Sequence, residues 1–162
     1  MPNNRWDIQT PPACFMEEGY DVGQIAPDMR MTDQHGDTVS LWQFYGSVVV
    51  IDLYAMWSLP AVQATREGER SPDALMEQHE GLTVLTLITE RAYGYGADAD
   101  DLRDWANTLS QAAPVVSDDE RHHTHFITDH IYPKTLLIDR NMQFIDVDVQ
   151  DLPQALDVLL AR

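Results

Sequence analysis

The sequence contains a single cysteine, Cys14, among 162 residues. One cysteine cannot form an intramolecular disulfide, and it cannot build a metal site made only of cysteines. Positive charge is also scarce, because 10 Lys and Arg stand against 27 Asp and Glu, which gives a formal net charge of −17 at pH 7. A surface of that sign repels phosphate groups, so we expect neither nucleic acid nor an anionic membrane surface as a partner.

Long apolar segments are absent as well. The longest runs, 48–51 and 53–57, are separated by Asp52 and are too short to cross a bilayer, so no membrane insertion is expected. Residues 1–14 hold no apolar stretch of signal-peptide length. The location therefore stays unknown: the protein is cytoplasmic, or it is an exported protein whose signal has been removed.

The remaining composition is typical of a globular domain, with 44% hydrophobic residues, four Trp and six Tyr. The chain is long enough for one domain with a sizeable core and too short for two. Residues 1–22 are rich in Pro, Asn and charge and show no hydrophobic period, so we expect an N-terminal arm there. Residues 23–162 are expected to form the domain.

Apolar periodicity predicts strands that alternate with helices. Residues 48–55 form a nearly continuous apolar run that begins with β-branched side chains, which is typical of a central strand buried on both faces. Residues 98–111 carry apolar side chains on one helical face. The other expected elements are a hairpin over 29–41, a helix start near 58–60, a helix over 71–81, strands over 82–89, 115–116, 135–139 and 144–149, a short helix over 118–126, and a last helix that Asp151 caps. This order predicts an α/β fold, a three-layer α/β/α sandwich around a central mixed sheet.

One segment carries a resemblance to a known family. Residues 52–61 resemble the active-site strand and helix start of thioredoxins, in which a buried Asp lies on the strand and a Trp precedes a Cys-x-Pro-Cys motif. Asp52, Trp57 and Pro60 stand at the matching positions. The resemblance implies that the active-site end of the fold lies here.

Three further segments support the resemblance. Residues 131–139 resemble the cis-proline segment of thioredoxins, and residues 23–28 and 36–41 resemble the opening of redoxins. In their order and spacing, these segments make the domain similar to the thioredoxin-like redoxins of the AhpC/TSA superfamily, which include the TlpA-like thiol–disulfide oxidoreductases. The resemblance implies a thioredoxin-like fold with a redoxin-type N-terminal β-hairpin and a cis bond between Tyr132 and Pro133. Since such relatives are often exported, it favours a periplasmic location if a signal has been removed.

The chain departs from this family at the two positions that matter most. Ser58 and Ala61 stand where the family has its two active-site cysteines. Disulfide exchange needs a thiolate nucleophile, whereas a serine hydroxyl is barely ionised at neutral pH and an alanine cannot resolve a mixed disulfide. We therefore expect the chain to be inactive in the family reaction. Natural loss and deliberate replacement of the cysteines both stay open as explanations.

The resemblance also implies roles for the other site residues. In dithiol relatives the buried Asp takes and returns the proton of the second cysteine, so beside Ala61 the carboxyl of Asp52 is either a remnant or a hydrogen-bonded structural group. Trp57 is either a platform beside a peptide groove or an aromatic cover for the helix start. The function that we expect to remain is recognition of a protein or an extended peptide near Trp57, Tyr132 and Pro133, without a cofactor.

Four histidines within residues 122–130 support an alternative of a different class. His122 and His125 stand three residues apart, which places them on one helix face, and His130 lies close to Pro133 in sequence. With the nearby aspartates these side chains could bind zinc, copper or nickel, which would make the chain a metal-handling protein. We favour a solvated polar helix and no metal site. The copper-binding relatives use two cysteines and one histidine as ligands, and this chain lacks both of those cysteines.

Overall fold

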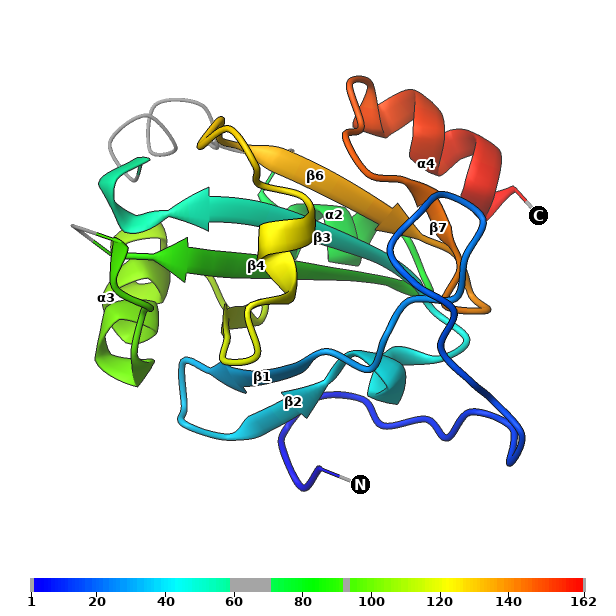
Figure 1. Cartoon of the computed structure of the whole chain (residues 1–162), viewed down its shortest axis with the longest axis horizontal. Coiled ribbons are helices and arrows are strands. Elements are labelled where there is room, and N and C mark those ends of the chain that lie inside the picture. The colour runs from blue at the N-terminus through cyan, green and yellow to red at the C-terminus, as the bar shows by residue number, and fades with distance from the viewer. Residues whose placement is uncertain (1, 59–70, 92–93, 162) are drawn as a thin grey trace.

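A computed structural model describes residues 2–58, 71–91 and 94–161 of the chain. Within these residues, seven strands form one sheet in the order β2-β1-β5-β4-β3-β6-β7 (Figure 1). In chain order the elements are β1 (Arg30–Asp33), β2 (Thr38–Ser40), the 3-10 turn η1 (Leu41–Phe44), β3 (Val48–Ala55), the 3-10 turn η2 (Met56–Ser58), α2 (Pro72–Gln78), β4 (Leu82–Glu90), α3 (Ala99–Leu109), β5 (Val115–Asp118), the 3-10 turn η4 (His122–His125), β6 (Lys134–Ile138), β7 (Phe144–Asp146) and α4 (Leu152–Leu160). Most of the helix start predicted near residues 58–60 lies outside the described residues.

The sheet is mixed, as predicted. β3 pairs in parallel with β4, and β4 pairs in parallel with β5. β6 runs antiparallel to β3, and β7 runs antiparallel to β6. On the other side the predicted β1–β2 hairpin joins the same sheet, with β1 antiparallel to β5. The parallel strands β3, β4 and β5 therefore all end at one side of the molecule, where α/β proteins place their ligand sites.

The three α-helices of the described part pack on one face of the sheet. Val48, Val50 and Tyr54 alternate along β3, so they point to the same face. Val48 and Val50 pack in a cluster with apolar residues of α2 and α4, while Tyr54 packs on Trp105 of α3 with ring centroids 5.5 Å apart. None of the described helices is long and apolar enough to span a membrane.

A row of polar side chains divides this helix-covered face. Asp52 on β3 lies in register with Thr135 of β6 on one side and with Thr86 of β4 on the other. Thr135 donates a hydrogen bond from Oγ1 to Oδ1 of Asp52 at 2.6 Å, and Gln111 donates from Nε2 to Oγ1 of Thr86 at 3.0 Å. The row separates the apolar cluster beneath α2 and α4 from the cluster beneath α3.

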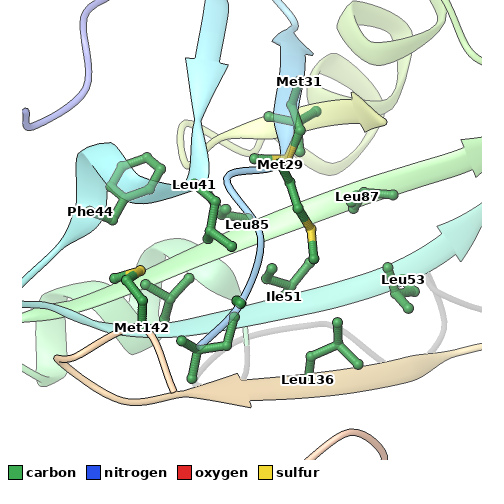
Figure 2. Close-up of a cluster of buried hydrophobic side chains, with 14 of the residues drawn as sticks. Met29, Met31, Leu41, Phe44, Ile51, Leu53, Leu85, Leu87, Leu136 and Met142 are labelled. Atoms are coloured by element: carbon green, nitrogen blue, oxygen red, sulfur yellow. The ribbon is translucent and has the colours of Figure 1, made fainter. Parts of the chain in front are cut away.

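The opposite face carries one continuous apolar cluster (Figure 2). Alternate side chains of β3, β4 and β6 build it, among them Ile51, Leu85 and Leu136, each at most 1% exposed. No α-helix of the described part contributes a side chain to this cluster. It is covered instead by η1, by the segment that contains η4, and by three aromatic residues of the N-terminal arm: Trp6, Phe15 and Tyr20.

The helix predicted over residues 118–126 was wrong. β5 continues to Asp118, and only the 3-10 turn η4 follows it. The Asp118 carboxylate accepts hydrogen bonds from the backbone N and the ring Nδ1 of His123, so it fixes the start of a tight turn. The segment 119–125 is polar throughout and offers no apolar stripe that would hold a longer helix against the sheet.

The caps of the other helices follow the sequence. The Ser71 side chain accepts a hydrogen bond from the backbone N of Ala74 at the start of α2, and Asp151 accepts one from Gln154 at the start of α4. The strand predicted over 144–149 is shorter and ends at Asp146, whose carboxylate accepts from the backbone N of Asp148. That local bond turns the chain out of the sheet.

The N-terminal arm lies against the domain and reaches both outer strands. Near its start, Nδ2 of Asn4 donates to the carbonyl oxygen of Thr38 in β2 at 2.7 Å. Where the arm meets the domain, the backbone N of Gly23 donates to the Phe144 carbonyl oxygen in β7 at 2.7 Å, and the Phe144 N donates back to the carbonyl of Gln24 at 3.0 Å. One segment therefore crosses the molecule from β2 to β7 (Figure 1).

Candidate functional site

The turn that follows β3 places Trp57 and Ser58 at the carboxyl end of the parallel strands. Trp57 is 53% exposed, and its indole Nε1 donates to Oε1 of Glu90 at 3.1 Å. The Ser58 hydroxyl donates to the carbonyl oxygen of Ala55 at 2.6 Å, within the same turn. The serine oxygen thus carries an ordinary structural hydrogen bond, and no described base contacts it.

Tyr132 and Pro133 lie beside Trp57 because β6 runs antiparallel to β3. The start of β6 meets the end of β3, and Lys134 pairs with Leu53 in register. The rings of Trp57 and Tyr132 meet edge to face, with centroids 5.5 Å apart and planes at 86°. The Tyr132–Pro133 peptide bond is cis, as predicted. Two parts of the predicted site that are distant in the sequence therefore form one surface.

Thr89 and Glu90, at the end of β4, hold this aromatic pair in place, and the sequence analysis missed both. Oγ1 of Thr89 lies 2.7 Å from the hydroxyl of Tyr132 and donates to the Tyr54 carbonyl oxygen at 3.1 Å. Burial raises the pKa of Tyr132 above its ordinary value; the hydrogen bond with Thr89 opposes this rise and the Glu90 charge adds to it. The phenol is therefore neutral at physiological pH. The signal that could have found these residues is a polar pair at the end of a buried parallel strand.

Asp52 is buried on the helix-covered face, as its place in the apolar run predicted. It is 2% exposed, and Thr135 is one of its hydrogen-bond partners. A partnered carboxyl in this position fits the hydrogen-bonded structural group that the sequence analysis left open. The predicted site positions Pro60 and Ala61 lie outside the described residues, so the proton-transfer role that the resemblance implies stays a prediction.

A cavity of about 310 Å³ opens beside this surface, at the carboxyl ends of β4 and β5. Thr89 and Glu90 line it together with the loop glycines Gly94 and Gly96 and with residues of β5 and η4. A larger hollow of about 540 Å³ between the arm and the β1–β2 hairpin includes none of the site residues named above.

Asp118 and His123 form a buried pair in the wall of this cavity. The Asp118 side chain is 0% exposed, and its Oδ2 accepts from the backbone N of His123 at 2.6 Å and from Nδ1 at 2.8 Å. Burial works to raise the pKa of Asp118, but the hydrogen bonds from the side chain and the backbone of His123 hold it below its ordinary value. The carboxylate is therefore charged, and it fixes the orientation of the imidazole.

The remaining histidines do not gather into a metal site. His122 uses both ring nitrogens, one with the Tyr20 hydroxyl at 2.8 Å and one with the Glu120 carboxylate at 3.0 Å. His125 stacks on Tyr20 with ring centroids 3.7 Å apart, and His130 is exposed. Among the described residues, no group of three or more His, Cys, Asp or Glu side chains could hold a metal ion. The metal-handling alternative therefore gains no support from the site geometry.

Comparison with known protein families matches residues 22–147 to the AhpC/TSA family. The chain belongs to this family. The match covers the hairpin, the central strands and the site described above, and it confirms the redoxin resemblance that the sequence indicated. No curated protein sequence matches the chain.

Solved structures of thiol–disulfide oxidoreductases share the fold. A protein assigned as the thiol:disulfide interchange protein DsbE of Chlorobium tepidum is 22% identical, with 88% of this chain and 99% of that chain covered and a TM-score of 0.68. A protein assigned as a disulfide isomerase of Bacteroides thetaiotaomicron is 18% identical, with 91% and 96% covered and a TM-score of 0.65. A thiol-disulfide oxidoreductase of Bacteroides vulgatus is 18% identical, with 86% and 96% covered and a TM-score of 0.62. These likenesses confirm a thioredoxin-like fold.

Proposed function

We propose that this protein is a thioredoxin-fold binding module that recognises an extended peptide and carries out no disulfide exchange. The observation that carries the proposal is the pair formed by the exposed Trp57 and the partly buried Tyr132, which stands beside Ser58 where the family has its nucleophilic cysteine. Among the described residues the one thiol is that of Cys14, which is exposed and lies in the arm. Recognition can persist after the redox chemistry is lost, because the two depend on different atoms.

The chemistry of Ser58 supports the absence of turnover. A nucleophilic serine needs an adjacent base to take its proton. The Ser58 hydroxyl instead donates its proton to the Ala55 carbonyl, which cannot act as such a base. The sulfur that would accept electrons in the family reaction is also missing, so no redox couple is available at this position.

The surface beside Ser58 suits an extended peptide. Trp57 offers a half-exposed ring to an apolar or planar group, and Ile131 is 61% exposed just before Tyr132. The backbone of residues 131–133 precedes the start of β6 and can pair with an added strand, while the aromatic rings select side chains. The glycine-rich loop and Glu90 border the same surface.

A disulfide-exchange assay tests the redox half of this proposal. The chain with Cys14→Ser should not reduce a model disulfide substrate, and Ser58→Cys with Ala61→Cys in the same background should form a reversible intramolecular disulfide and gain turnover. The introduced thiol at position 58 should be more acidic than an ordinary thiol if it sits at the family's nucleophile position. Turnover without the two added cysteines, or no disulfide in the folded double variant, would contradict the proposal.

A peptide selection tests the binding half. A random displayed heptapeptide library is panned against the chain, and the affinity of a selected peptide is measured by calorimetry. Trp57→Ala and Tyr132→Ala should each weaken that affinity about tenfold or more, since they remove stacking surface. Val158→Ala is the control, because Val158 is 56% exposed and lies on α4, outside this surface. Equal losses in the control, or no enriched peptide, would contradict peptide recognition at this surface.

A further inference from the structure

The cavity beside Glu90 presents negative charge to any group that enters it. Its wall contains the carboxylates of Glu90, Asp118 and Asp119, against the single guanidinium of Arg121. Arg121 forms no ion pair with any carboxylate in the described ranges. Asp119 accepts hydrogen bonds from the hydroxyl groups of Thr32 and Ser117, which leave its charge in place. The cavity therefore carries an excess of negative charge.

Two acceptors of the buried pair lack a donor from the chain. Oδ1 of Asp118 receives no hydrogen bond from the described residues, although the side chain is 0% exposed. In the tautomer that donates from Nδ1 to Asp118, Nε2 of His123 is an acceptor. Nε2 forms no hydrogen bond within the described part either. A ligand rich in N–H donors that enters the cavity would meet the carboxylates of Glu90 and Asp119 and the Nε2 atom of His123.

The cavity is joined directly to the peptide-binding surface. Glu90 lines the cavity and also accepts from Trp57, while Thr89 lines it and bonds to Tyr132. Gly96 in the cavity lining has open space beside it, because a Cβ added there would meet no atom within 4 Å. A peptide that lies on the two rings would therefore place a neighbouring side chain at this opening.

We propose that the cavity is a guanidinium subsite, which takes an arginine side chain of the peptide bound at Trp57 and Tyr132. A guanidinium carries five N–H donors, no acceptor and one positive charge, so it matches carboxylate oxygens and an imidazole Nε2. A lysine ammonium has three donors around a compact charge and fits a set of divergent acceptors less well. The inference rests on the proposed function for the peptide, but the cavity itself is testable with a free ligand.

The first experiment titrates the chain with L-argininamide and follows backbone amide shifts by NMR. The amides of Glu90, Gly94, Gly96, Asp119 and His123 should shift in a saturable way. L-citrullinamide, which has nearly the same shape but no charge, should produce no saturable shift at these positions. Absence of saturable cavity shifts with L-argininamide, or equal affinity for the two compounds, overturns the subsite.

Charge variants separate a local site from the general acidity of the chain. Glu90→Gln with Asp119→Asn should weaken L-argininamide binding about tenfold, because it removes two charged acceptors. Glu77→Gln with Asp157→Asn changes the net charge equally on exposed helix positions and should leave the affinity unchanged. Arg121→Ala should tighten binding, since it removes the competing cation. Equal weakening in the two double variants overturns the assignment.

A peptide comparison separates this inference from the function on which it rests. A selected peptide that contains arginine is resynthesised with citrulline at that position, and both are measured by calorimetry. The citrulline peptide should bind about tenfold more weakly. Equal affinities would refute the subsite and leave peptide recognition intact. If L-argininamide binds in the cavity but no peptide binds at the rings, peptide recognition fails, and the subsite is one for small guanidinium ligands.

Discussion

The two faces of the sheet are covered by different kinds of structure. One face is covered by α2, α3 and α4 and is divided by the row that contains Asp52, whereas the other carries a continuous apolar cluster beneath turns and the arm. Buried aspartates occur on both faces, among them Asp52 and Asp118. Asp52 bonds to a neutral hydroxyl from the next strand, and Asp118 bonds to an imidazole and a backbone N–H from η4. A face that no described α-helix covers can thus bury its side chains as fully as one with helices, because alternate strand residues supply the apolar surface.

The largest expected effect comes from creating a cavity in the undivided face, which is the face that carries the continuous apolar cluster. Leu85 is 0% exposed and belongs to the continuous apolar cluster (Figure 2). Leu85→Ala should lower the free energy of unfolding by about 2–5 kcal/mol, measured by urea denaturation, because a strand residue in a sheet cannot collapse into the space. Val158→Ala, at a position 56% exposed on α4, should change it by less than about 0.5 kcal/mol. A loss below that control would show that this face is loosely packed.

A smaller loss of stability is expected at a strand position whose side chain donates a buried hydrogen bond. Thr135→Val removes the donor to the buried Asp52 carboxyl and should lower the free energy of unfolding by about 1–3 kcal/mol. Thr83→Val is the matched control on the undivided face, where no hydrogen bond of the Thr83 hydroxyl exists within the described residues. It should be neutral or slightly stabilising. If both variants behave alike, the bond to Asp52 contributes nothing to stability.

The arm should contribute a comparable or lesser amount to the stability of the face that no described α-helix covers. Phe15 meets the rings of Trp42 and Tyr45 edge to face, with centroids 4.9 Å and 5.3 Å away. Phe15→Ala should therefore lower the free energy of unfolding by about 1–2 kcal/mol in urea denaturation. Met16→Ala, one residue along and 73% exposed, should have no measurable effect. Equal stability of the two variants would mean that the arm rests on the domain without stabilising it.

The smallest expected effect is a dependence of the unfolding free energy on pH in the acidic range. The folded state holds the pKa of Asp118 below its ordinary value of about 3.9, so the unfolded chain binds this proton first as pH falls. The stability that Asp118 supplies is complete above that value and is lost as pH falls through the lower folded pKa. The difference in unfolding free energy between the wild type and Asp118→Asn should therefore shrink as pH is lowered from 6 towards 3. The exposed control Asp157→Asn should show no such trend, and a constant difference for Asp118→Asn would refute the linkage.

The sequence predicted the helices, the strands and the location of the site better than it predicted the hydrogen-bond partners of buried side chains. The run around Asp52 indicated a buried strand, and the resemblance placed Trp57 near Pro133. The Thr135 partner was not predictable, because it depends on the register between β3 and β6, which only the folded sheet sets. Spacing alone suggested a helix after Asp118, but the bond from that carboxylate to His123 competes with helical pairing and shortens it to a turn.

The course of the N-terminal arm has a consequence for self-association. The unpaired margins of an open sheet expose N–H and C=O groups that invite a second chain to add a strand, which is a common start of aggregation. In this protein the Asn4 side chain donates a hydrogen bond to a carbonyl oxygen of β2, and Gly23 and Gln24 form backbone hydrogen bonds with β7. One segment of the chain therefore covers backbone groups at both edges of the sheet. Removal of residues 1–24 would therefore free a backbone carbonyl of β2 and the Phe144 backbone groups of β7 at once, and it should favour edge-to-edge association of the sheets.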